Sequence, residues 1–166
     1  MRKILAAAAA LLLLSACASA QKLDAAGDVH ALLTSIRDND EATFDAHVDR
    51  PALEREIESR IVQRAGKEKG LGGLRALLAP TLAQMAGDAL IQPSVFRTVA
   101  ESYGYEPSKP LPGRFAIAST LKPLDDGRVC ATRKKNGPCV LIFTHGDGVW
   151  RLSGFEGDMK DLRLKR

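Results

Sequence analysis

The chain has 166 residues, with 24 Lys and Arg against 20 Asp and Glu, and a formal net charge of +4. Arg2 and Lys3 lie in a segment that we expect to be removed, and their loss lowers the charge by two units. Such a balanced charge argues against a nucleic-acid-binding protein. The length suits a single domain with its own core.

Residues 1–20 have the pattern of a secretory signal. Arg2 and Lys3 precede an unbroken run of Ile, Leu and Ala from Ile4 to Leu14. As a helix this run would be about 16 Å long, much shorter than the roughly 30 Å hydrocarbon core of a bilayer. A basic start, a short apolar run and small residues after it are typical of a signal that is cleaved.

Two cleavage sites compete at the end of this signal. Leu14-Ser15-Ala16-Cys17 resembles a lipobox and predicts cleavage before Cys17, with acylation of that cysteine. Ala18-Ser19-Ala20 fits a small-x-small rule and predicts a soluble periplasmic or secreted protein that starts at Gln21. The lipobox is the more specific pattern and directly follows the apolar run. It favours a lipoprotein anchored in the cell envelope that faces the periplasm.

Residues 24–101 have the periodicity of helices. Asp40 is expected to cap a second, short helix, and Pro51 suits the first turn of a third helix after Asp49. Further apolar stripes predict that the third helix ends at Gly66, that a helical segment follows, and that a last short helix starts after residue 93. Apolar residues at i, i+3, i+4 and i+7 predict the first helix over 24–37, through Val29, Leu32, Leu33 and Ile36.

A proline-rich connector over 103–113 separates the helical part from residues 114–156, which show the pattern of strands. The expected strands contain Phe115, Ile117 and Leu121, then Val129 to Thr132, Cys139 to Thr144 and Val149 to Glu156. Turns are expected at Asp125-Asp126-Gly127 and His145-Gly146-Asp147-Gly148. Helices followed by strands predict one α+β domain over 21–166, with the N-terminal helices packed on a C-terminal four-stranded antiparallel meander sheet. Residues 157–166 are a basic tail.

With Cys17 assigned to acylation, Cys130 and Cys139 remain. An even pair in an exported chain predicts a disulfide, which here would clip the second hairpin. A centred register would place Cys130 directly opposite Cys139. A two-residue turn at Asn136-Gly137 would instead place Cys130 opposite Phe143, and Pro138 argues against that register.

Several stretches together resemble a known family. An apolar helix from Val29 to Arg37 is followed by Val48-Asp49-Arg50-Pro51-Ala52-Leu53, then by Leu90-Ile91-Gln92-Pro93, and the last strand contains Trp150-Arg151-Leu152. Over residues 28–156 this pattern looks like the bacterial domain-of-unknown-function family 2939, which consists of exported or membrane-anchored proteins. The resemblance implies no activity and no catalytic residues. The connector at 103–113 and the paired cysteines depart from the family pattern.

A looser likeness concerns architecture. A helical start followed by an antiparallel sheet that ends in a Trp-containing strand is similar to cystatin-like cone domains, which include nuclear-transport-factor-like and ketosteroid-isomerase-like proteins. Such a likeness implies a cone-shaped fold and says little about function.

The sequence contains no convincing catalytic, cofactor-binding or metal-binding pattern. His30, His47 and His145 lack the spacing of metal ligands, and helix-surface or turn positions explain them better. Asp38-Asn39-Asp40 lacks the glycine and the distal Glu of a calcium loop. The charged third helix is expected to carry weak surface ion pairs, Arg50 with Glu54 and Glu56 with Arg60. The site residues that the sequence predicts are therefore Cys17 for lipidation and Cys130 and Cys139 for the disulfide.

The sequence favours a non-enzymatic binding or interaction module of the cell envelope. Its expected partners are the membrane, through the N-terminal lipid, and an envelope protein or a small apolar ligand. Nucleic acid is not an expected partner. The alternatives are a small pocket enzyme, either an isomerase or a hydrolase, and an apolar-ligand carrier on a cone fold. A basic hairpin tip around Arg128 and residues 133–135, together with the basic tail, could also contact anionic lipid.

Overall fold

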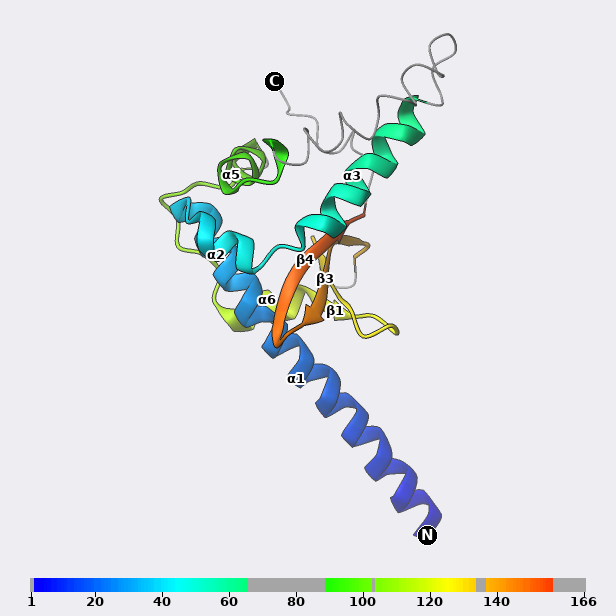
Figure 1. The fold of residues 1–166 in the computed structure, drawn as a ribbon. Helices are drawn as coiled ribbons and strands as arrows, with labels where there is room; N and C mark the ends of the chain where they lie inside the picture. Colours follow the sequence, from blue (N-terminus) through cyan, green and yellow to red (C-terminus); the bar gives the residue numbers. More distant parts are fainter. Residues whose placement is uncertain (1, 66–88, 103, 134–136, 157–166) are drawn as a thin grey trace.

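The computed structural model describes residues 2–65, 89–102, 104–133 and 137–156. The fold is α+β, as predicted, with helices packed on a C-terminal antiparallel sheet (Figure 1). The helices are α1 (Arg2–Asp38), α2 (Glu41–Ala46), α3 (Arg50–Ala65), α5 (Pro93–Ser102) and α6 (Arg114–Thr120). The strands are β1 (Leu121–Pro123), β2 (Val129–Thr132), β3 (Cys139–Gly146) and β4 (Val149–Phe155). The predicted end of α3 at Gly66, most of the helical segment after it and the basic tail lie outside the described residues.

Helix α1 is longer than the predicted 24–37, because the signal segment and the first helix of the domain are continuous. The first half of α1 extends away from the rest of the fold (Figure 1). Ala25 and Ala26 are its first buried residues among those described. The helix ends where Asn39 adopts a left-handed conformation with φ of 56°. Within the described residues no helix has both the length and the apolar character needed to cross a bilayer.

Both predicted helix starts around α2 and α3 are confirmed. The Asp40 side chain accepts a hydrogen bond from the Thr43 backbone N–H at 3.1 Å and so caps α2. The Asp49 side chain accepts from the Ala52 N–H at 3.0 Å, and Pro51 lies in the first turn of α3. Local sequence signals therefore define the two short connections around α2.

The first predicted strand is wrong, because residues around Phe115 form helix α6. Ile117 and Ala118 are buried, whereas Phe115 is 82% exposed. The buried positions continue to Leu121 at helical spacing, and the exposed Phe115 gave the segment a false alternating pattern. The chain becomes extended only at β1, so the helices are not confined to residues 24–101.

The sheet is an antiparallel meander with strand order β1-β2-β3-β4, as predicted. The β3–β4 turn contains Asp147 and Gly148, with φ of 53° and 77°. Two successive residues with positive φ are typical of the two-residue turns that match strand twist. His145, which was expected in this turn, instead lies in β3.

The predicted disulfide between Cys130 and Cys139 is present, and the two Cα atoms are 5.5 Å apart. Neither predicted register is correct, because Cys130 lies opposite Ile142 and Cys139 lies opposite Thr132. The register shifts between these pairs, so that Val140 is the extra residue of a bulge in β3. This bulge brings the diagonally placed cysteines within bonding range.

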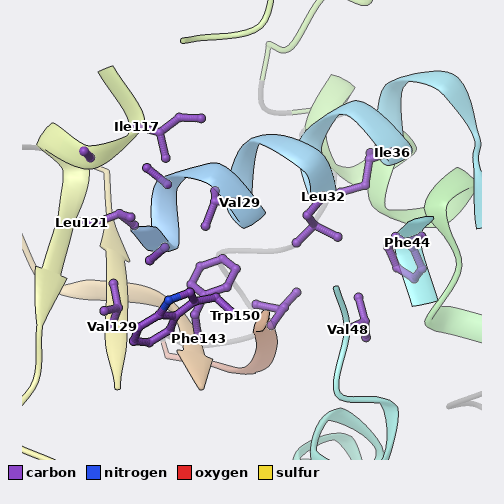
Figure 2. Packing of buried hydrophobic residues seen from close by; sticks show 14 of the residues in the cluster. Val29, Leu32, Ile36, Phe44, Val48, Ile117, Leu121, Val129, Phe143 and Trp150 are labelled. Atoms are coloured by element: carbon purple, nitrogen blue, oxygen red, sulfur yellow. The ribbon is translucent and has the colours of Figure 1, made fainter. Parts of the chain in front are cut away.

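The core lies between α1 and the sheet (Figure 2). Val29 and Leu32 of α1 pack over Phe143 and Trp150, while α2 adds Phe44 farther along α1. Trp150 is only 4% exposed and is therefore part of this core. The remaining members of the cluster are aliphatic, among them Ile36, Val48, Leu53, Ile91, Ile117, Leu121, Val129 and Leu152.

Candidate functional site

Polar contacts join α1 to β4, which lie far apart in the sequence. Asp24 accepts a hydrogen bond from Trp150 Nε1 at 2.8 Å, and Asp28 accepts one from the Trp150 backbone N–H at 2.8 Å. The two carboxylates are four residues apart and therefore share one face of the helix. Neither carboxylate was predicted as a contact residue, although an acidic pair beside an apolar helical stripe is visible in the sequence.

His47 lies next to this pair. Its Nδ1 is 2.8 Å from the Thr43 carbonyl oxygen, and because a carbonyl oxygen only accepts, Nδ1 carries a hydrogen. Its Nε2 is 3.6 Å from Asp28 Oδ1, which is beyond hydrogen-bond distance. The His47 side chain is only 14% exposed, so the predicted surface position is wrong. The Nδ1 bond is local to the end of α2, and the 3.6 Å separation means that His47 and Asp28 do not form a hydrogen-bonded dyad.

The segment that follows His47 covers the outer edge of β4. The Leu152 N–H donates to the His47 carbonyl oxygen at 2.9 Å, and the Asp49 N–H donates to the Leu152 carbonyl oxygen at 2.9 Å. These bonds form an isolated parallel bridge between Val48 and Leu152. Together with Asp28, they satisfy backbone groups that an edge strand would otherwise present to other chains. The α1–β4 cluster is thus explained by protection of an edge strand.

The other two histidines take no part in a shared site. His145 is exposed, and its ring centroid is 5.0 Å from that of Trp150. His30 is half-buried on α1. Across the described ranges no three His, Cys, Asp or Glu side chains gather in a way that would hold a metal ion.

The ion pairs on α3 differ partly from the prediction. Arg60 pairs with Glu56 at 2.6 Å, as expected, but Arg50 pairs with Asp45 at 2.6 Å instead of with Glu54. Arg60 also donates to the Phe155 carbonyl oxygen at 2.7 Å and lies 4.3 Å from the centroid of the Phe155 ring. This face of α3 therefore contacts the end of β4 and is not simply solvated.

Among the described residues, three carboxyl groups have a lowered pKa, and each cause is local. The hydrogen bond from Arg37 lowers the pKa of Asp38, and hydrogen bonds from Thr43 lower the pKa of Asp40. The Arg128 guanidinium lowers the pKa of Asp126 in the same way, at an N–O distance of 2.6 Å. All three carboxyl groups are exposed, and they belong to helix ends and a turn. These shifts reflect caps and surface ion pairs and do not mark a catalytic centre.

The two described residues of the predicted basic hairpin tip, Arg128 and Arg133, lie at opposite ends of β2. Arg128 precedes β2 and is paired with Asp126, whereas Arg133 follows β2 at its other end. Residues 134–136 and the basic tail lie outside the described residues. The predicted contact with anionic lipid would therefore involve residues at opposite ends of β2.

Residues 21–23 of α1 contact two other elements. Gln21 Nε2 donates to the Gly127 carbonyl oxygen at 3.0 Å, which brings the β1–β2 turn to this part of α1. Arg114 Nη2 donates to the Leu23 carbonyl oxygen at 3.2 Å, which brings the start of α6 to the same level. Residues 21 and 23, four and six positions after Cys17, therefore contact the folded domain.

Comparisons with curated proteins and with solved structures found no match. A family model matches residues 5–99. This range includes two of the stretches that carried the resemblance, residues 48–53 and 90–93. It does not extend over the predicted 28–156, since it starts in the apolar run and ends before the sheet and both paired cysteines. Because the match covers more than half of the 166 residues, the chain belongs to the family described as "Protein of unknown function (DUF2939)".

Proposed function

We propose that the protein is an exported lipoprotein of the bacterial cell envelope, held at the membrane by acyl chains on Cys17. The lipobox that ends at Cys17, directly after the apolar run, carries this proposal. Ala25, the first buried residue among those whose side chains are described, comes eight positions later. Cleavage before Cys17 therefore removes no residue of the described core.

Two further observations support export. The Cys130–Cys139 disulfide fits an oxidising compartment such as the periplasm. The family match begins at residue 5, within the apolar run, so this run is part of what the family has in common. More than one acyl chain on Cys17 would give stable anchoring, since a single chain holds a protein only marginally.

We propose that the domain acts as a binding or interaction module and not as a pocket enzyme. The interface between α1 and the sheet is filled with aliphatic and aromatic side chains. The buried polar side chains among the described residues are Ser35 and Thr132, and each donates to a nearby backbone carbonyl oxygen. A pocket enzyme or a carrier would need catalytic groups or open space at this interface, so an envelope protein is the favoured partner.

The mass of the intact protein extracted from membranes tests the anchoring. We expect a chain that starts at Cys17 and carries acyl chains. Cys17→Ser should remove the lipid and leave cleavage after Ala20, so that the protein moves to the soluble fraction. The double variant Cys130→Ala/Cys139→Ala is the matched control and should stay acylated. An unmodified wild-type chain starting at Gln21 would contradict the proposal.

A further inference from the structure

Phe115 is the most exposed large apolar side chain among the described residues, at 82%. Leu23, which is 37% exposed, lies close by in the fold, because Arg114 donates to its carbonyl oxygen at 3.2 Å. A Cβ atom on Gly27 would approach the Arg114 guanidinium to 3.0 Å, which confirms how closely α6 lies against α1. Two exposed apolar side chains from distant parts of the sequence therefore share one end of the domain.

This end is the one that Cys17 would face. Leu23 is six positions after Cys17, which corresponds to about 9 Å along a helix. Gln21 holds the β1–β2 turn at the same level through its bond to Gly127. We call this region, consisting of residues 21–23, residues 114–115 and the β1–β2 turn, the anchor end.

The charges of the anchor end suit a bilayer surface. Lys22 and Arg114 supply cations, Asp125 and Asp126 supply anions, and the adjacent Asp24 carboxylate accepts a hydrogen bond from Trp150 Nε1. Asp126 is neutralised by Arg128 at 2.6 Å, so the two cations face less opposing charge. Basic side chains near a membrane are attracted to anionic headgroups.

We infer that the anchor end rests on the lipid bilayer, with the Phe115 ring inserted at the boundary between headgroups and acyl chains. The inference rests on the proposed acylation of Cys17. An interfacial element buries its apolar side chains about 5–10 Å into this boundary. The helical rise of about 9 Å between Cys17 and Leu23 is comparable to this depth. The lipid and Phe115 together then hold the domain in one orientation, with α5 directed away from the membrane. Arg97 of α5 contacts the opposite end of α1, through the Arg37 carbonyl oxygen at 3.3 Å.

Fluorescence quenching in vesicles tests this inference. The acylated protein, verified by its mass, is reconstituted into vesicles of phosphatidylethanolamine and phosphatidylglycerol that contain lipid brominated near the top of its acyl chains. Phe115→Trp adds an indole at the anchor end, and Thr98→Trp adds one at an exposed position of α5 as the matched control. Subtracting the wild-type signal removes the contribution of Trp150.

Because an interfacial side chain lies near the top of the acyl chains, we expect bromine to quench the added signal of Phe115→Trp by about twofold and to leave that of Thr98→Trp unchanged. An acylated Phe115→Trp protein with no quenching would overturn this inference and leave the proposed acylation intact. A blue-shifted but unquenched signal would show that a protein surface covers Phe115, and would also overturn it. A mass showing a chain that starts at Gln21 would overturn both proposals.

Discussion

Asp24 of α1 and Trp150 of β4 are joined by a hydrogen bond from the indole Nε1 at 2.8 Å, across a sequence separation of 126 residues. The neighbouring Asp28 accepts the backbone N–H of the same tryptophan. The helix that continues from the proposed lipid anchor is thereby fastened to the last strand of the sheet. The proposed anchoring through Cys17 would therefore orient the sheet together with α1.

Asp24→Ala should lower the free energy of unfolding by about 1 kcal/mol, because the indole N–H loses its acceptor. Asp24→Asn is the matched control, since its side-chain carbonyl oxygen still accepts the bond. Urea unfolding monitored by Trp150 fluorescence measures both variants. Equal losses for the two variants would show that the carboxylate charge matters rather than the hydrogen bond.

Trp150→Ala should cost about 3–5 kcal/mol, because it removes a large side chain that is 4% exposed and packed under α1. Trp150→Phe keeps most of the apolar volume and should cost clearly less. Denaturant unfolding followed by circular dichroism provides the comparison, since both variants lack the native fluorophore. An unchanged midpoint for Trp150→Ala would exclude a core role.

Local signals in the sequence predicted the parts of the fold that depend on neighbouring residues. The caps at Asp40 and Asp49 and the strand containing Trp150 are where short-range patterns place them. Helix α6 was missed because the exposed Phe115 lies where a strand pattern needs a buried side chain. An exposed apolar residue of this kind makes a helical segment look like a strand when only the pattern of apolar residues is considered.

Contacts between residues far apart in the sequence could not be predicted from the spacing of residues along the chain. The paired cysteines could be predicted from their number and from export, but the bulge at Val140 that sets their register depends on the whole sheet. The contacts of Asp24 and Asp28 with Trp150 required knowing that α1 crosses the edge of β4. The proposed anchor end likewise depends on α6 lying against α1.

The cap at Asp40 should make stability depend on pH. The Thr43 hydroxyl and backbone N–H donate to the Asp40 carboxylate at 2.6 and 3.1 Å and lower its pKa. A lowered pKa means that the stabilisation is complete above the unfolded value of about 3.9 and is lost as the pH falls through the folded pKa. The Tm difference between wild type and Asp40→Ala should therefore shrink in acid.

Asp40→Asn serves as the control for this titration. Its side chain caps the helix without an ionisable group, so its Tm advantage over Asp40→Ala should change little over the same pH range. Thermal unfolding measured from neutral pH to about pH 2 covers the relevant window. A wild-type advantage that stays constant in acid would show that the carboxylate form of Asp40 contributes nothing.

The Cys130–Cys139 disulfide should stabilise the protein by about 2.7 kcal/mol on the chain-entropy account, given the short loop that it closes with a sequence separation of 9. Cys130 is fully buried, so alanine is the better replacement because serine would bury an additional hydroxyl group. Urea unfolding of Cys130→Ala/Cys139→Ala should show this loss. Adding a reductant should lower the stability of wild type by a similar amount and leave the double variant unchanged. Denatured, unreduced wild type should yield no reactive thiol from either position, and two reactive thiols there would contradict the disulfide.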